Sequence, residues 1–333
     1  MSLLRKFLFP FSLLFAVAQT FRNFLYDYEI ITNSKFDTPT ISIGNLSFGG
    51  TGKTPMVGYL LSNYLKKYQI ATLSRGYKRN SKGFLKLDLK SEINYVGDEP
   101  YTLKITYPKS EVYVCENRVF GIKRILKDFK CDLIILDDAF QHRRLSVRLN
   151  IILTNFSYPF YSDYIMPFGN LREPRSSYKR ADIIIVSKCP ENLNSNEMDE
   201  IKSKIKLIKN QKLFFTTVVY KEKIYGDKIE NIKAFSGKEI ILVTGIAETK
   251  NIEKYLNNKK IKFKHLKYSD HHNYSKYDID SIKIISRNLN VITTKKDYYK
   301  LNEKISNLFY LDIETKFLKD ESIFLKEINK ILN

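Results

Sequence analysis

The sequence has few cysteines and lacks an apolar stretch long enough to cross a membrane. Its three cysteines, Cys115, Cys131 and Cys189, contain no Cys-x-x-Cys pair, so the sequence implies reduced thiols rather than a zinc site or a disulfide framework. The apolar run at residues 7–18 contains Pro10 and is shorter than the about 20 residues of a spanning helix. Internal repeats are also missing. The 333 residues remain sufficient for two globular domains.

Acidic residues are scarce relative to basic ones. The chain has 36 Asp and Glu against 56 Lys and Arg, a formal net charge of +20. Such an excess indicates a polyanionic partner, which could be nucleic acid, an anionic membrane or a phosphorylated substrate. The lysines are scattered, however, and no nucleic-acid-binding motif accompanies them. We therefore expect no nucleic acid among the partners.

A glycine-rich segment carries the clearest chemistry. A β-branched run, Thr40 to Ile43, predicts a buried strand, and apolar residues at helical spacing after Pro55 predict a helix. Between them, Gly49-Gly50-Thr51-Gly52-Lys53-Thr54 matches the phosphate-contacting half of a phosphate-binding loop, although Ser47 stands where the strict pattern has glycine. In such a loop the backbone N–H groups and lysine bind phosphates, and the hydroxyl of Thr54 can bind Mg²⁺. The segment predicts a site for a nucleoside triphosphate, with ATP and Mg²⁺ as cofactors.

Further strand and helix patterns divide the chain. The buried run from Cys131 ends in Asp137 and Asp138, the position at which a magnesium-binding aspartate follows a phosphate loop. Alternating strands and helices predict an α/β fold: a P-loop NTPase-type parallel-sheet domain at residues 31–212 and a smaller α/β domain at 238–333. We expect short linker strands at 213–237 and a polar turn at Val96–Pro100.

The first 30 residues differ from the rest and allow three interpretations. Basic residues around an apolar run, followed by Ala16-Val17-Ala18, are compatible with a signal peptide. A spanning helix is disfavoured by the short run and Pro10. The third interpretation is an amphipathic helix lying on a membrane, with apolar residues such as Phe11 and Leu14 in the acyl boundary and Arg5, Lys6 and Arg22 at the headgroups. Because an ATP-using protein stays in the cytosol, we favour the membrane-interface helix over export and over simple packing on the domain.

Taken together, the motifs resemble those of the tetraacyldisaccharide 4′-kinase (lipid A 4′-kinase) family. The matching segments cover residues 41 to about 300 in family order. They are Gly44-Asn45, Gly49-Gly50-Thr51-Gly52-Lys53-Thr54-Pro55, Ser74-Arg75-Gly76-Tyr77, Gly97-Asp98-Glu99-Pro100, Asp137-Asp138-Ala139-Phe140-Gln141-His142-Arg143, Gly169-Asn170-Leu171-Arg172-Glu173-Pro174, Gly245-Ile246-Ala247 and Asp270-His271-His272. The phosphate loop alone indicates only a superfamily, whereas its combination with the other segments is specific.

The resemblance implies transfer of the ATP γ-phosphate to the 4′-hydroxyl of a tetraacyl glucosamine disaccharide 1-phosphate. It also implies a membrane-associated enzyme with its active site between two domains. We expect a peripheral protein at the cytoplasmic face of the inner membrane, and a monomer. By resemblance, Asp98 accepts the hydroxyl proton with help from His271, and Thr54, Asp137 and Asp138 hold Mg²⁺. Candidates for contacting the substrate headgroup are Arg118, Gln141, His142, Arg172 and Glu173, because arginine binds phosphate oxygens in pairs; each could instead form an internal ion pair.

The sequence departs from the family pattern in three places. Ala139 replaces a usual glycine, Thr249 a frequent proline, and Thr294-Lys295-Lys296-Asp297 stands for a TEKD-like run. Two other functions stay open from the residues alone: a phosphotransferase acting on a soluble sugar or nucleotide, and a membrane-docked nucleotide switch. A lipid substrate predicts an apolar groove beside the nucleotide site, which a soluble substrate does not require.

Overall fold

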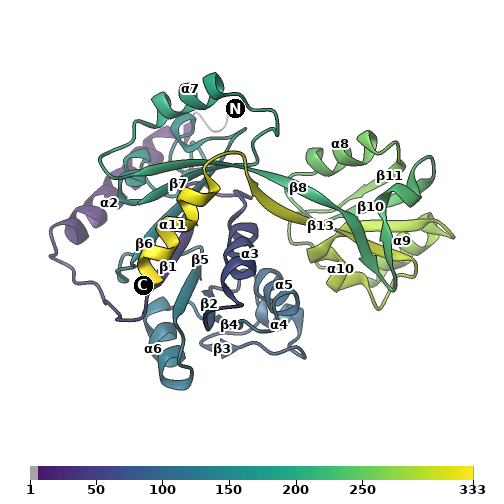
Figure 1. Cartoon of the computed structure of the whole chain (residues 1–333), viewed down its shortest axis with the longest axis horizontal. Coiled ribbons are helices and arrows are strands. Elements are labelled where there is room, and N and C mark those ends of the chain that lie inside the picture. The colour runs from purple at the N-terminus through teal and green to yellow at the C-terminus, as the bar shows by residue number, and fades with distance from the viewer. Residues whose placement is uncertain (1–6, 333) are drawn as a thin grey trace.

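A mostly parallel sheet forms the larger of two units (Figure 1). The computed structural model describes residues 7–332. The strand predicted from Thr40 is confirmed, lies in the middle of this sheet and pairs in parallel with strands on both sides. In sheet order the strands are β3 (Leu85–Lys86), β4 (Glu111–Val114), β2 (Ile70–Ser74), β5 (Leu133–Asp137), β1 (Thr40–Asn45), β6 (Leu149–Asn155) and β7 (Ile183–Ser187). Of these neighbours, β3 and β4 are antiparallel.

Helices cover both faces of this sheet. On one face, α3 (Lys53–Tyr64), α5 (Asp98–Thr106) and α11 (Glu321–Leu332) share a core with the central strands. On the other face lie α6 (Arg118–Asp128) and α7 (Ser195–Ile205). Apolar spacing explains α3, whose Met56, Val57, Leu60 and Leu61 are fully buried. Three short helices, α4 (Ile93–Val96), η1 (Phe160–Ser162) and η2 (Arg175–Arg180), lie in the connections.

The second unit repeats the α/β alternation on a smaller scale. Its parallel strands are β11 (Lys262–Lys267), β10 (Glu239–Thr244), β12 (Asn290–Thr294) and β13 (Leu308–Phe317). The helix α8 (Lys250–Asn258) and the short η3 (Ile232–Phe235) pack on one face, and α9 (Lys276–Ser286) and α10 (Lys295–Leu301) on the other. The predicted α/β class and largely parallel sheet are therefore confirmed.

The connection between the units differs from the predicted short strands. A single strand, β8 (Lys212–Gly226), pairs in parallel with β7 through its first residues and antiparallel with β13 through the remainder. A short strand, β9 (Ile229–Asn231), then turns back along β8. The polar run Lys221-Glu222-Lys223 looks like an interruption in the sequence. In the structure this run lies where the register between β8 and β13 shifts, between the pairs Tyr220–Ile313 and Ile224–Leu311, so its polar side chains do not interrupt the paired segments on either side.

The segment predicted as a polar turn contains the start of a helix. Gly97 makes the turn, with φ of 98°, and Asp98 is the first residue of α5. The helix is explained by features that also occur in turns: two acids in its first turn, which favour a helix N-terminus, and a proline within that turn. Asp98 is consequently held on a rigid element.

The last helix returns to the larger unit. Phe324 of α11 is fully buried and its ring contacts the rings of Tyr59, Phe214 and Phe317. The hydroxyl of Tyr59 donates to Glu321 at 2.6 Å. The predicted smaller domain included this helix, and no motif in the sequence indicated that it packs against α3.

We expect Phe324→Ala to lower the free energy of unfolding by about 3–5 kcal/mol, the usual range for removing a buried phenylalanine. Ile323→Ala, one residue away with a 45% exposed side chain, is the matched control and should change it by less than about 1 kcal/mol. Urea unfolding of both variants measures the difference. Equal losses would contradict the packing of α11 as the closing element of this core.

The helix α2 (Phe9–Asp27) turns its polar side toward the protein. The hydroxyl of Ser12 accepts from the backbone of Phe168 at 2.7 Å, and Asn23 donates to Ser177. Its apolar side chains face outward, and the most exposed of them are Phe9, Phe11, Leu13, Leu14, Val17 and Phe21. Among residues 7–332, no helix is both long and apolar enough to cross a membrane.

Candidate active site

The glycine-rich loop joins β1 to α3 and is braced from two sides. Gly49 and Gly52 have φ of 107° and 84°, conformations that favour glycine. The side chain of Asn45 donates to the hydroxyl of Thr51 at 2.9 Å, and Ser187 at the end of β7 donates to the Thr51 carbonyl at 2.7 Å. These bonds fix the loop at the N-terminus of α3, where backbone N–H groups and the helix dipole favour an anion.

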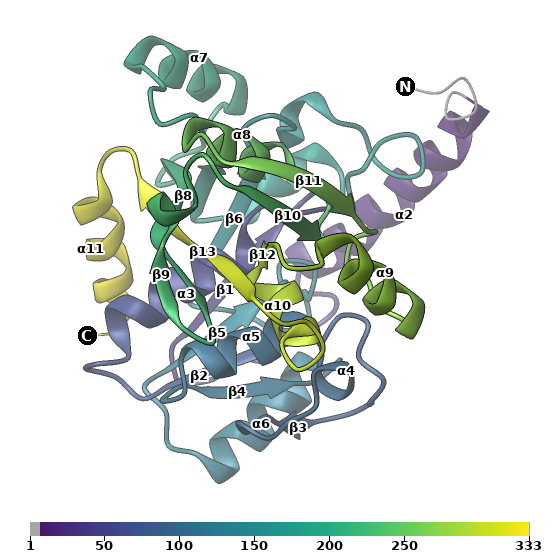
Figure 2. The ribbon, with the colours of Figure 1, turned by 90° about the vertical axis from the view of Figure 1, so that its right-hand side faces the viewer.

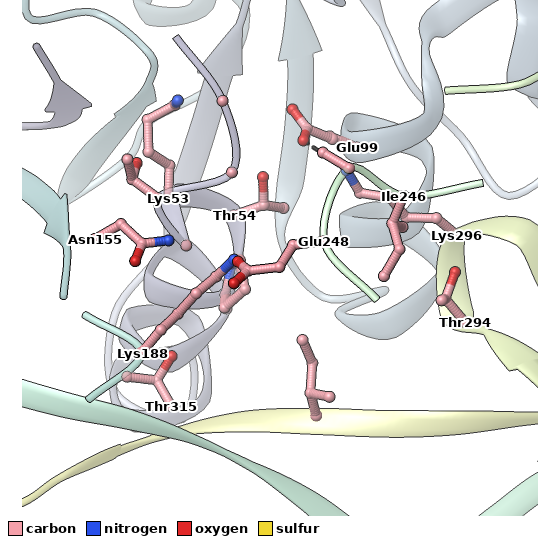
Figure 3. Close-up of a pocket in the computed structure, with 18 of the residues that line it drawn as sticks. Lys53, Thr54, Glu99, Asn155, Lys188, Ile246, Glu248, Thr294, Lys296 and Thr315 are labelled. Carbon is pink, nitrogen blue, oxygen red and sulfur yellow. Dashed lines mark hydrogen bonds and ion pairs between the residues drawn. The ribbon is translucent and has the colours of Figure 1, made fainter. Parts of the chain in front are cut away.

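The loop lines a large cleft between the two units. The cleft has a volume of about 1570 Å³, and it brings together residues from Ser47 to Glu321 of the chain. Figure 3 shows Lys53 and Thr54 of the larger unit near Glu248 and Lys296 of the smaller one. The lining from the smaller unit includes Ile246, Ala247, Glu248, Thr249, Lys250, Lys267, Asp270, His271, Lys295 and Lys296.

Lys53, Thr54, Asp137 and Asp138 converge at the start of α3. The Lys53 ammonium lies 3.6 Å from an oxygen of Asp138, and Thr54 donates to Asp137 at 3.3 Å. Arg172 donates to both oxygens of Asp138 at 2.9 Å. Burial alone would raise the pKa of Asp138, but Lys53 and Arg172 hold it below its usual value. Asp138 is therefore an anion already neutralised by protein cations.

Asp137 is in a different electrostatic position. Burial, followed by the nearby charge of Glu99, raises the pKa of Asp137 above its ordinary value. Its Oδ1 atom is buried and has no hydrogen-bond partner among the described residues. A buried acid with an unpartnered oxygen and too few cations around it is suited to a bound divalent cation, because the cation supplies the missing counter-charge.

Asp98 and His271 lie in contact, as the resemblance implied for a proton-accepting pair. The Nδ1 atom of His271 lies 3.1 Å from Oδ2 of Asp98, and Lys300 donates to the same oxygen at 2.5 Å. Burial raises the pKa of Asp98, but these two hydrogen bonds hold it below the usual value overall. His271 lines the cleft, whereas Asp98 does not. Because an ionised carboxylate only accepts, Nδ1 of His271 carries a proton, which leaves Nε2 as the ring nitrogen that can accept one.

The proposed substrate residues occupy several environments. Arg172 lines the cleft and its guanidinium covers the ring of Phe48 at 4.6 Å. Gln141 donates to the carbonyl of Asn45 at 2.8 Å, and burial followed by nearby arginines lowers the pKa of His142 to about 4. Neither of these two lines the cleft.

Arg118 and Glu173 are more deeply enclosed. Arg118 is buried behind β5, where it donates to the carbonyls of Cys115 and Asp137. Glu173 is fully buried and forms ion pairs with Arg22 at 3.2 Å and Arg180 at 2.6 Å. Their direct partners are protein groups, which is the arrangement that the sequence analysis gave as the alternative to substrate contact.

Three cations near the cleft were not predicted. Lys300 and Lys296 lie one turn apart on α10 and pair with Asp98 and Glu99 at the start of α5; Figure 2 shows α10 over α5. The sequence does contain a signal for Lys296 and Lys300. Thr294 and Asp297 form a helix-start pattern, and a helix that begins there places both lysines on one face. Lys188 follows β7 and pairs with Glu248; no sequence pattern distinguished it from the other lysines.

Comparison with known proteins decides the family. The family model for tetraacyldisaccharide-1-phosphate 4′-kinase matches residues 4–333. The chain is 42% identical to the tetraacyldisaccharide 4′-kinase of Flavobacterium johnsoniae over 97% of this chain and 96% of that protein. The enzyme of Flavobacterium psychrophilum is also 42% identical, over 98% and 97%. The chain belongs to the tetraacyldisaccharide 4′-kinase family.

A solved structure agrees with this membership. The crystal structure of LpxK from Aquifex aeolicus in complex with ATP matches with a TM-score of 0.81 at 32% identity, covering 99% of this chain and all of that one. The predicted family and kinase class are thus confirmed. The individual roles of the residues described above remain predictions.

Proposed function

We propose that this tetraacyldisaccharide 4′-kinase transfers the γ-phosphate of ATP to the 4′-hydroxyl of a tetraacyl glucosamine disaccharide 1-phosphate, a precursor of lipid A. The observation that carries the proposal is the single cleft that is lined by both the phosphate loop and His271. Phosphoryl transfer depends mainly on positioning and neutralisation of charge. A cleft with a phosphate cradle on one wall and a proton acceptor on the other supplies both.

Mg²⁺ fits the acids beside the phosphate loop. Thr54 and Asp137 would hold it, the unpartnered Oδ1 of Asp137 being the strongest reason, with Asp138 beside them. Two protein ligands suffice, because Mg²⁺ commonly takes its remaining ligands from water and substrate phosphates. When bound, the ion neutralises charge on the β- and γ-phosphates. No group of three or more His, Cys, Asp or Glu with metal-site geometry occurs within residues 7–332.

We expect Asp137→Asn to reduce turnover by about 10²-fold or more, because it removes the anion nearest Thr54 while preserving size. In thermal unfolding, ATP with Mg²⁺ should stabilise the wild type more than ATP alone, and this increment should vanish in the variant. Asp132→Asn, at the residue just before the start of the same strand, is the matched control. Wild-type magnesium dependence in Asp137→Asn would show that another group holds the ion.

The proton of the attacking hydroxyl passes to the Asp98–His271 pair. With Nδ1 bonded to Asp98, Nε2 of His271 is available to accept the proton at the cleft. Asp98, held ionised by Lys300, then stabilises the imidazolium. From the resemblance we expected Asp98 to be the acceptor and His271 to assist it. The arrangement of the cleft favours His271 as the group that meets the hydroxyl.

The lipid part of the substrate has a suitable apolar surface. A groove of about 420 Å³ lies between α2 and the loop that follows Ile165, lined by Phe11, Leu14, Phe15, Ala18, Met166 and Pro167. Arg22, on the same helix, forms an ion pair with Glu173. Glu173 follows Arg172 in the sequence, and Arg172 pairs with Asp138 in the active site. We propose that the groove accepts an acyl chain and that Arg172, Gln141, His142, Arg118 and Glu173 form or support the surface for the sugar headgroup.

The outward apolar face of α2 supports peripheral attachment to an anionic membrane, at the cytoplasmic face of the inner membrane. A lipid substrate keeps its acyl chains in the bilayer, so an enzyme acting on its sugars has to reach the headgroup layer. Arg22, proposed for the headgroups, instead pairs with Glu173. Arg5 and Lys6 lie outside the described residues. The attachment therefore rests on the apolar residues.

We expect the double variant Leu13→Asn, Val17→Asn to bind anionic vesicles about tenfold more weakly or worse, because each side chain loses the benefit of entering the acyl boundary. The KM for lipid substrate should rise and that for ATP should stay unchanged. Thr20→Asn on the same helix is the control. Vesicle co-sedimentation with kinetics on both substrates measures these effects, and unchanged sedimentation would mean that α2 serves only to pack on the domain.

One assay tests the proposed reaction. The protein is incubated with γ-labelled ATP, Mg²⁺ and the tetraacyl disaccharide 1-phosphate in detergent, and separately with glucosamine or with no acceptor. Label in the lipid product alone supports the proposal. Label in the soluble sugar would favour the soluble phosphotransferase, and slow phosphate release without an acceptor would favour the nucleotide switch.

A further inference from the structure

An ion pair spans the cleft directly beside the phosphate loop. Lys188 follows the last residue of β7 in the larger unit, and Glu248 belongs to the loop after β10 in the smaller one. The ammonium of Lys188 lies 2.7 Å from Oε2 of Glu248. Both residues line the cleft, and Figure 3 shows their side chains pointing toward each other near the start of α3.

Lys188 lies beside the loop that would bind the phosphates of a nucleotide. A Cβ atom built on Gly50 would lie 3.7 Å from the Lys188 ammonium, so this cation lies over the phosphate loop. The adjacent Ser187 holds the loop through its hydrogen bond to the Thr51 carbonyl. Lys188 also has φ of 56°, in the left-handed region that lysine seldom occupies. This conformation directs a side chain from the strand end into the cleft.

The negative charge of Glu248 beside the phosphate loop becomes unfavourable once a nucleotide is bound. The side chains of Lys188 and Glu248 are 19% and 28% exposed, so their charges are only partly screened. A triphosphate in the loop brings several negative charges close to Lys188 and repels the Glu248 carboxylate. The Lys188 ammonium has three N–H donors, but a carboxylate and a triphosphate held at the same cation repel each other, and the nucleotide carries the larger charge.

We propose that Lys188 binds ATP and that, before a nucleotide binds, Lys188 is held in an ion pair by Glu248. Glu248 therefore competes with ATP for the same cation. Binding of ATP exchanges the partner of Lys188 and releases a link between the units. The inference rests on ATP binding in this cleft. It adds a second cation, from a different strand, to the Lys53 of the phosphate loop, and it assigns an inhibitory contact to the smaller unit.

Two single variants separate this proposal from a purely structural ion pair. Lys188→Gln should weaken ATP binding about tenfold, the loss of one charge-assisted contact. Glu248→Gln should have the opposite effect and tighten ATP binding by about threefold, because the competing carboxylate is gone. Lys212→Gln is the matched control: it breaks the Lys212–Glu327 pair outside the cleft and should leave ATP affinity unchanged. Calorimetric titration of the full chain with ATP measures all three.

The charge-swapped double variant, Lys188→Glu with Glu248→Lys, gives the sharpest comparison. It can re-form the ion pair, but it places a carboxylate over the phosphate loop. We expect ATP affinity to fall at least as far as in Lys188→Gln, with a thermal stability close to that of the wild type. Wild-type affinity in the swapped variant, or weaker binding in Glu248→Gln, would overturn the proposal. Failure of the wild type to bind ATP would instead overturn the proposed function on which it rests.

Discussion

Replacing Lys53 by alanine should abolish phosphoryl transfer. Lys53 is the cation within the phosphate loop, at the first position of α3, and its ammonium approaches Asp138 at 3.6 Å. Removing it leaves the γ-phosphate without its principal positive partner when charge develops on the transferred group. It also leaves Asp138 with Arg172 as its remaining ion-pair partner among the described residues. We expect turnover with saturating lipid substrate to fall below about one thousandth of wild type.

The control for this variant is Lys67→Ala, an exposed lysine just beyond the same helix, which should retain full activity. Circular dichroism and thermal unfolding establish that both variants fold. If folded Lys53→Ala keeps wild-type turnover, the glycine-rich loop is not the phosphate site. Partial activity with a strongly raised KM for ATP would limit Lys53 to binding and remove it from the transition state.

Removal of either member of the Asp98–His271 pair should lower turnover by about 10²-fold or more, the usual contribution of a positioned general base. His271→Ala removes the nitrogen that faces the cleft. Asp98→Ala leaves the ring without its fixed partner and leaves the buried ammonium of Lys300 uncompensated. If the two act as one unit, the double variant should lose far less than the product of the single losses. Kinetics with saturating ATP and lipid measure this coupling.

Asp98→Asn distinguishes the two roles. The amide keeps the shape of the side chain, yet it can no longer stabilise an imidazolium, so its loss should approach that of His271→Ala. Ser269→Ala, in the same loop as His271, should leave turnover nearly unchanged. Wild-type turnover in both Asp98→Asn and His271→Ala would require a different proton acceptor in the cleft.

The sequence predicted local features better than long-range ones. Periodicity and chain order predict the strand at Thr40, the helix after the phosphate loop and the acids at the end of the strand that contains Asp137. Each occurs where expected. The meeting of Asp98 with His271 was inferred only from resemblance, since 173 positions separate them. No pattern near Asp98 indicates that α10 supplies Lys300, because that contact depends on how the two units are oriented.

The boundaries of elements were missed for a related reason. Lys221-Glu222-Lys223 interrupts an apolar pattern, and β8 stays one long strand because it pairs with β13 on both sides of this run, across a register shift. Phe324 and Ile328 have helical spacing that fits either unit, so the sequence could not determine that α11 packs against α3. Lys188 illustrates the limit most clearly. One lysine among many becomes noteworthy only when Gly50 and Glu248 lie beside it.

The return of α11 has a consequence for biosynthesis. The chain leaves the larger unit through β8, builds the entire smaller unit, and comes back through β13 before α11 reaches its place. During translation the phosphate loop therefore leaves the ribosome long before Phe324 and Ile328, which complete the core against α3. A nascent chain stalled after residue 316 should expose the apolar surface of α3 and be a client for chaperones. The larger unit, which carries the phosphate loop, is therefore synthesised first, but its core is completed only after the smaller unit has been synthesised.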